Sequence, residues 1–220
     1  MSSLVNNFAL CECGNRFPIQ QYASINVTRD PHLKEALFDG TLAMFSCPSC
    51  GIRSEVKHDL LYHDMERKLM ILHATSDSSG VSSIASRPLD ICQEALLDYN
   101  LRIVGEWNHL LEKIVVFDAG LDDFVFEAVK TQVWLQYSHL SSLAPDTFLC
   151  ESIVRDEKSM RYQFVDTEIS RENAFEMDDS GIYEELSNAT YSVRKVNPFP
   201  KGEWALVTQQ SASDRLSLGE

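Results

Sequence analysis

The sequence predicts an α+β protein, in which an N-terminal zinc-ribbon-like antiparallel β unit with one short helix precedes a helix-rich α+β domain. Three observations predict this class. Two close cysteine pairs lie within the first 51 residues, short strand-like segments surround them, and several longer amphipathic helical stripes follow a Ser-rich segment. The 220 residues are 44% hydrophobic and 24% charged, which is the composition of a globular protein with a sizeable core.

The second cysteine pair, in Cys-Pro-Ser-Cys-Gly at 47–51, has the spacing of a metal-binding knuckle. Two residues between Cys47 and Cys50 form a tight turn that directs both sulfur atoms to one side. Pro48 fixes its own φ in this turn, and Gly51 supplies the positive φ needed after it. This pair therefore predicts two ligands of one metal ion.

The first pair, in Cys-Glu-Cys-Gly at 11–14, has one residue fewer between its cysteines. Residues i and i+2 of an extended segment point to the same face, so we expect this pair to bind one ion from a strand end. Zinc prefers four ligands, and a site of four thiolates has no open position for catalysis. The sequence predicts one structural zinc ion per chain, against unrelated buried thiols or an iron site. Its expected ligands are Cys11, Cys13, Cys47 and Cys50.

The segments around the cysteines alternate between strand and turn patterns. Asp30 and Pro31 predict the start of a short helix with an apolar face, and Gly40 predicts its end. A turn is expected at 63–66. Strands are predicted at 17–27, 41–46, 54–62 and 68–73.

These residues resemble the CpXC domain, a mainly bacterial family named for its Cys-Pro-Xaa-Cys motif. The resemblance covers the first third of the chain and extends to weaker matches at 111–114 and 120–123. It implies a bacterial source and metal-binding cysteines, and the family has no established biochemical activity. The matching pieces are Cys-Glu-Cys-Gly at 11–14, Asp30-Pro31, Gly40, Cys-Pro-Ser-Cys-Gly at 47–51 and Tyr-His-Asp at 62–64.

A polar, Ser-rich segment separates the cysteine-containing part from the rest of the chain. Stripes of apolar residues at helical spacing follow it, and then a hairpin, a short helix and a last strand. The expected domains are 1–75, a zinc-ribbon-like domain; 76–87, a linker; 88–208, an acidic α+β domain; and 209–220, a disordered tail. Helices are predicted at 88–99, 107–115, 122–137 and 182–189, and strands at 148–154, 160–165 and 204–208.

The net charge of −14 is unevenly distributed. Residues 1–75 carry 7 Lys and Arg against 8 Asp and Glu, so almost all of the excess negative charge lies in residues 76–220. An acidic body repels nucleic acid and anionic membranes, and it suits a basic protein partner. The simpler alternative is that the charge only keeps the protein in solution.

One group of histidines and aspartates could carry chemistry. A second metal or a general acid–base pair could be built from it. The odd spacing of its first two histidines and the abundance of Asp in turns favour a turn instead. The group comprises His58, Asp59, His63, Asp64 and His73. We therefore predict no catalytic and no cofactor-binding residues.

The function predicted from these features is that of a zinc-stabilised protein-interaction or adaptor module. The main alternative is a nucleic-acid-associated regulator that uses the zinc ribbon, and the third is a metal-dependent hydrolase with a site near His58, His63 and Asp64. The chain has no stretch of about 18 apolar residues and no signal-peptide pattern at its start, so a cytoplasmic protein is expected. The sequence leaves the partner and the oligomeric state open.

Overall fold

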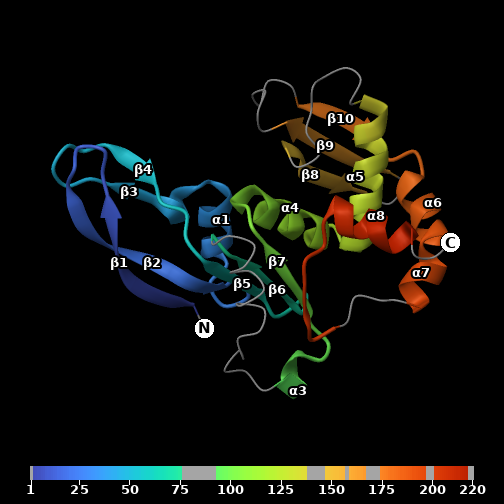
Figure 1. The fold of residues 1–220 in the computed structure, drawn as a ribbon, viewed down its shortest axis with the longest axis horizontal. Helices are drawn as coiled ribbons and strands as arrows, with labels where there is room; N and C mark the ends of the chain where they lie inside the picture. The colour runs from blue at the N-terminus through green and yellow to red at the C-terminus, as the bar shows by residue number, and fades with distance from the viewer. Residues whose placement is uncertain are drawn as a thin grey trace. The chain divides into compact units, whose positions relative to one another are not determined.

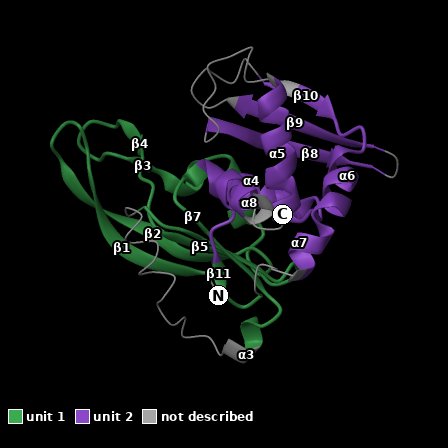
Figure 2. Ribbon diagram, turned by 45° about the vertical axis from the view of Figure 1, so that its right-hand side comes forward, with its two compact units in different colours: residues 1–107, 201–204 green, residues 108–200, 205–220 purple. Residues whose placement is uncertain are grey.

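The computed structural model describes residues 2–75, 93–137, 147–156, 159–166, 174–196 and 201–217 (Figure 1). The chain folds into two compact units, coloured separately in Figure 2. Unit 1 comprises residues 1–107 and 201–204, and unit 2 comprises residues 108–200 and 205–220. The predicted α+β class is confirmed, because an N-terminal unit of mainly antiparallel strands is followed by a region with most of the helix.

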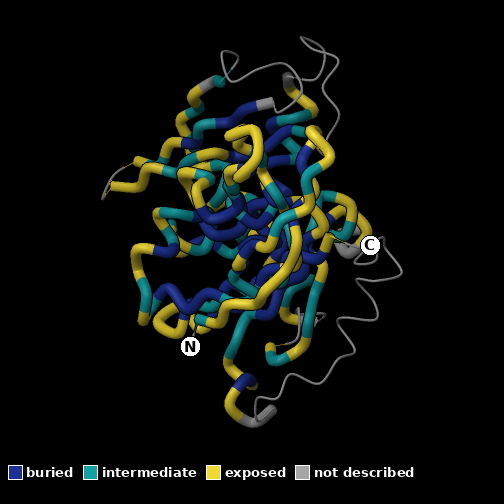
Figure 3. Tube along the Cα trace, turned by 90° about the vertical axis from the view of Figure 1, so that its left-hand side faces the viewer, coloured by how far each residue is buried: buried dark blue, intermediate teal, exposed yellow. Residues whose placement is uncertain are grey.

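Unit 1 is built on a six-stranded sheet, in which β1 with β2 and β5 with β6 form antiparallel hairpins. Parallel pairs join β2 to β5 and β6 to β7. Ile25, Tyr62 and Ile71 are fully buried. Figure 3 shows the chain coloured by burial, with the buried segments in dark blue. The strand order is β1 (Ser3–Leu10), β2 (Arg16–Asn26), β5 (Leu60–Asp64), β6 (Leu69–His73), β7 (Asn100–Val104) and β11 (Trp204–Ala205).

A separate two-stranded sheet, β3 (Met44–Ser46) with β4 (Arg53–Glu55), carries the second cysteine pair. It follows α1 (His32–Phe38) and the 3-10 helix η1 (Thr41–Ala43). Helix α1 buries Leu33 and Leu37, and Gly40 after it has φ +77°, as a helix stop requires. The predicted strands at 41–46 and 54–62 are therefore each only partly extended, since η1 occupies 41–43 and residues 56–59 lie between β4 and β5.

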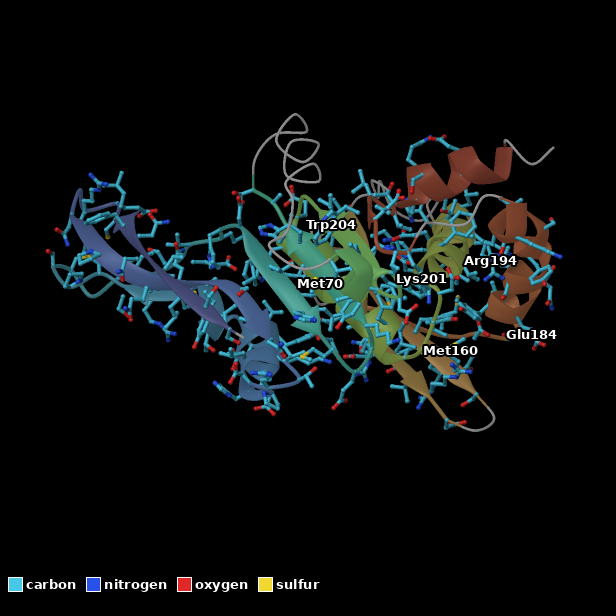
Figure 4. All side chains as sticks on the ribbon, turned by 90° about the horizontal axis from the view of Figure 1, so that it is seen from below. Met70, Met160, Glu184, Arg194, Lys201 and Trp204 are labelled. Atoms are coloured by element: carbon cyan, nitrogen blue, oxygen red, sulfur yellow. The ribbon has the colours of Figure 1, made fainter. Side chains whose placement is uncertain are left out.

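The helix predicted at 88–99 is confirmed at 93–96, but it ends three residues earlier than predicted. Only α3 (Gln93–Leu96) is helical there, and β7 follows at once. Met70, Leu96 and Leu101 form a small cluster against which Trp204 packs. Met70 and Trp204 are labelled in Figure 4. Burial of this short apolar strand in the sheet outweighs the helical spacing before it.

Unit 1 extends beyond the predicted N-terminal domain of 1–75, because β7 and residues 201–204 complete its sheet. The predicted linker at 76–87 lies outside the described residues. The domain boundaries expected around it stay a prediction.

Unit 2 combines a three-stranded antiparallel sheet with five helices among its described residues. The helices predicted at 107–115, 122–137 and 182–189 and the hairpin of 148–154 with 160–165 are confirmed within a few residues. The sheet order is β10 (Phe175–Asp178), β9 (Met160–Asp166) and β8 (Phe148–Arg155). The helices are α4 (Trp107–Asp118), α5 (Asp123–Tyr137), α6 (Ile182–Ala189), α7 (Tyr191–Val196) and α8 (Gln209–Ser217).

Helix α8 lies where the sequence predicts a disordered tail. The Thr208 and Ser211 side chains accept hydrogen bonds reciprocally from each other's backbone N–H groups, at 3.2 and 2.8 Å. Ala212 is buried against Phe124 and Val207. A reciprocal cap and one buried contact therefore make 209–217 helical despite its polar composition.

Five charged side chains are buried between α4 and α5. Lys130 Nζ lies 2.7 Å from Glu112 Oε2 and 3.3 Å from Glu127 Oε2. Lys113 Nζ lies 2.6 Å from Glu127 Oε1 and 3.4 Å from Asp123 Oδ2. Each member is at most 4% exposed as a residue, so this network depends on its internal pairing.

Candidate metal centre

The second knuckle is held by two backbone hydrogen bonds at the tip of the β3–β4 hairpin. Cys47 N–H donates to Ile52 O at 2.9 Å, and Gly51 N–H donates to Cys47 O at 2.9 Å. Gly51 has φ +74°, the left-handed conformation predicted for it. This turn brings the Cys47 and Cys50 side chains to one side of the hairpin end.

The first knuckle forms at the tip of the β1–β2 hairpin. Cys11 N–H donates to Asn15 O at 2.9 Å, Gly14 N–H donates to Cys11 O at 2.8 Å, and Gly14 has φ +84°. Residues 12 and 13 are therefore in a turn, and the extended geometry predicted for Cys11 and Cys13 is wrong. The first knuckle has one residue fewer between its cysteines, and its turn is correspondingly shorter. The hydrogen bond from Gly14 N–H to Cys11 O spans three positions, whereas that from Gly51 N–H to Cys47 O spans four.

The two knuckles bring four sulfur atoms together. Cys11 Sγ lies 3.5 Å from Cys50 Sγ, and Cys13 Sγ lies 3.7 Å from Cys47 Sγ. All four sulfurs lie within 4.8 Å of one another. Tetrahedral zinc with Zn–S bonds of about 2.3 Å separates its sulfurs by about 3.8 Å, so this set could hold a metal ion.

The hydrogen bonds around Cys47 favour its thiolate. Burial raises the pKa of Cys47, but backbone N–H groups of Cys50 and Ser49 and the side-chain amide of Asn15 donate to its sulfur and lower the pKa to about 6. Asn15 Nδ2 lies 3.6 Å from Cys47 Sγ. Asn15 could not be recognised as part of the site from sequence alone, since its only signal there is its position directly after Gly14.

The opposite shift occurs at Cys11. The backbone of Cys13 lowers the pKa of Cys11, but burial and hydrogen bonds with the three other thiols raise it to about 12. Four adjacent thiols resist losing all their protons without a cation between them. A divalent metal supplies that positive charge and stabilises the thiolates.

The histidines at 58 and 73 have structural partners. His58 Nε2 donates to Tyr22 O at 2.8 Å, and His58 Nδ1 lies 3.1 Å from Gln21 Nε2. His73 is buried, its Nδ1 donates to His58 O at 2.8 Å, and its ring lies edge-on to Trp107. Burial lowers the pKa of His73, which favours a neutral ring in this position.

The side chains of His63 and Asp64 also have hydrogen-bond partners within the fold. His63 Nε2 lies 3.2 Å from the Tyr99 hydroxyl. Asp64 is buried and accepts the backbone N–H groups of Glu66 and Arg67 at 3.0 and 3.1 Å. The predicted turn therefore forms, although at 65–68, and Asp64 stabilises it. Within the described ranges, the four cysteines are the one group of metal-ligating side chains close enough to share an ion.

The comparisons with known proteins agree with the cysteine geometry. A family model described as "CpXC protein" matches residues 10–130, which include both knuckles and more than half of the chain. No curated protein and no solved structure matches the chain. The chain therefore belongs to the CpXC family.

Proposed function

We propose that this protein is a zinc-stabilised protein-interaction module. The observation that supports it most directly is the convergence of four cysteine sulfurs from two hairpins, with separations of 3.5 and 3.7 Å between partners from opposite hairpins. A set of four thiolates is typical of structural zinc and offers no open position for a substrate. Zinc bound there would link the two hairpin tips and neutralise part of the thiolate charge.

Such a link would stabilise the β3–β4 hairpin. The β3–β4 hairpin belongs to a sheet of its own and has no backbone pairing with the β1–β2 hairpin. An isolated two-stranded hairpin is marginally stable in water. The free energy of binding structural zinc, about 10–16 kcal/mol in small zinc-finger peptides, is available to fold such a segment.

The interaction role is supported by the surface of unit 1. Three of its basic side chains are paired with acids, at 3.8 Å for Lys57 with Glu55, 3.2 Å for Arg67 with Asp64, and 2.8 Å for Lys68 with Asp98. These pairs weaken any basic surface that a nucleic-acid module would need. A protein partner is therefore favoured over nucleic acid.

The proposal places the module in a bacterial cytoplasm, a reducing compartment in which thiols stay available for metal. Within the described ranges, no helix is both long and apolar enough to cross a membrane.

The test is affinity capture from the host with the tagged full chain, alongside nucleic-acid binding in physiological salt. We expect zinc in the purified protein, capture of a protein partner, and loss of that partner in the Cys50→Ser variant. A Cys150→Ser variant is the matched control, because Cys150 lies in unit 2. Tight, salt-sensitive binding to DNA or RNA would contradict the proposal.

A further inference from the structure

Strand β1 is an open sheet edge without the usual protection. It is the first strand in the order of the six-stranded sheet and pairs only with β2 among the described strands (Figure 1). Natural edge strands are commonly guarded by charged residues or Pro. The eight residues of β1 include neither, in a chain with 52 charged residues.

The backbone groups on the open side of β1 can be identified from its register with β2. Phe8 lies opposite Pro18, which has no N–H to donate, and Phe8 N–H donates instead to Asn7 Oδ1 at 2.9 Å. The Phe8 backbone groups therefore point away from β2. Because this direction alternates along a strand, Leu4, Asn6 and Leu10 also direct their N–H and C=O groups to the open edge.

Exposed apolar side chains lie beside these groups on one face of the β1–β2 hairpin. Leu4 is 51% exposed, Phe8 56% and Leu10 76%. The Arg16 guanidinium lies 4.4 Å from the centre of the Phe8 ring. On the opposite face, Ala9 is buried. The exposed apolar side chains therefore lie beside the open edge, and β1 itself contributes no charged residue to this surface.

We propose that two copies of this chain pair through β1, antiparallel, about a twofold axis at Asn6. Asn6 lies midway between Leu4 and Phe8, the two apolar residues whose backbone groups face the open edge on either side of it. A twofold axis there places Leu4 of each copy opposite Phe8 of the other, and it pairs Asn6 with its own counterpart. About six backbone hydrogen bonds form across the axis, and the partner's carbonyl replaces Asn7 Oδ1 at Phe8 N–H.

Opposite charges at the two ends of β1 suit a second copy as the occupant. The chain carries a net charge of −14, so two copies repel each other over most surfaces, and the uncharged strand is where that repulsion is least. Antiparallel pairing also brings the Arg16 end of one hairpin to the Ser2 end of the other. Ser2 Oγ donates to the Asp30 carboxylate, so opposite charges approach at both ends of the interface.

This inference goes beyond the proposed interaction role and needs no other partner, so it is tested on the pure, zinc-loaded full chain. Sedimentation equilibrium should give twice the mass of one chain at micromolar concentration. Asn6→Pro removes the edge N–H at the axis, and Phe8→Lys places two like charges in the interface. Each should raise the dimer dissociation constant about tenfold or more.

Leu135→Lys is the matched control, because Leu135 is an equally exposed apolar residue on α5 in unit 2, 62% exposed. It should leave the dimer intact. Metal content and melting temperature check that each variant is folded. A monomer at hundreds of micromolar, or a dimer that only Leu135→Lys weakens, would overturn the proposal.

Discussion

The sulfur atoms of Cys13 and Cys47 lie 3.7 Å apart, although 34 positions separate the two residues in the chain. Each belongs to a different hairpin tip, and the two hairpins lie in different sheets. Without a metal, the neighbouring thiols stabilise each other only weakly, because a thiol is a weak hydrogen-bond donor and acceptor. The four cysteines could therefore share one metal ion, which would stabilise this arrangement.

Replacing a knuckle cysteine should unfold the metal-binding part of unit 1. Cys47→Ser removes one of four ligands, and metal binding supplies much of the folding free energy of such a small segment. We expect loss of stoichiometric zinc and rapid proteolysis within 1–75. Limited proteolysis with metal analysis measures both.

Cys150→Ser serves as the control for that experiment. Cys150 is buried in unit 2, where its thiol donates to Ser152 O at 3.3 Å. This variant should retain one zinc per chain. A Cys47→Ser protein with unchanged melting temperature and proteolysis pattern would show that the site is dispensable.

Asn15 should tune the affinity for the metal. Its amide donates to Cys47 Sγ, and loss of a hydrogen bond to a ligand typically costs 10- to 100-fold in affinity. We expect Asn15→Ala to bind zinc about tenfold more weakly in competition with a chromophoric chelator. Ser49→Ala, in the exposed part of the second knuckle, should bind normally. Equal affinities for the two variants would contradict this role for Asn15.

Stability should fall as the pH decreases through about 6.5, partly because of His73. Burial holds the pKa of His73 below its ordinary value of 6.5, so the unfolded chain binds more protons than the folded chain in this range. The contribution of neutral His73 to the free energy of unfolding is therefore fully present above pH 6.5, and it is lost as the pH falls below that value. Urea unfolding at about pH 7.5 and 5.5 measures the loss.

His73→Asn is the variant that isolates this contribution. Its side-chain amide can donate the hydrogen bond to His58 O, which His73 makes at 2.8 Å, but it does not titrate. The variant should show a smaller loss of stability between the two pH values than the unmodified chain. Parallel losses would contradict the assignment to His73.

Lys130 should be far more important for stability than an exposed lysine with a similar partner. Burial lowers the pKa of Lys130, but the carboxylates of Glu112 and Glu127 outweigh it and raise the pKa, so the side chain stays charged. Lys130→Met leaves both carboxylates buried beside an apolar side chain, and we expect a loss of about 3–5 kcal/mol.

Lys68→Met is the matched comparison, since the Lys68–Asp98 pair is exposed and surface pairs contribute about 0–1 kcal/mol. The difference is measured by chemical denaturation of the two variants under the same conditions. Similar small losses for both would show that the buried pairs contribute little.

The part of the site that could be predicted from sequence is the second knuckle, whose turn is determined by residues next to one another in the chain. Cys47, Cys50 and Gly51 define a turn by their spacing alone, and the structure has that turn. The conformation of Cys11 and Cys13 could not be predicted in the same way, because one intervening residue suits both an extended strand and a tight turn. The hydrogen bond between Gly14 and Cys11 decides between them only in the folded chain.

The fold was predictable where one face of an element is buried. The apolar face of α1, with Leu33 and Leu37, follows directly from helical spacing. Strand β1 has little burial on either face, so it lacks the alternation that marks a strand. Strand β7 is buried as a short apolar run, and its parallel pairing with β6 is a long-range contact that spacing does not reveal.

The central claim is tested most directly by native mass spectrometry with metal analysis of the protein purified from its own host. The account predicts one zinc ion per chain, whether the chain is single or paired. A folded protein without metal would contradict it, because four thiols would then share a site with no ion. Two metal ions per chain would also contradict it, because the described residues provide one cysteine cluster and one set of four ligands.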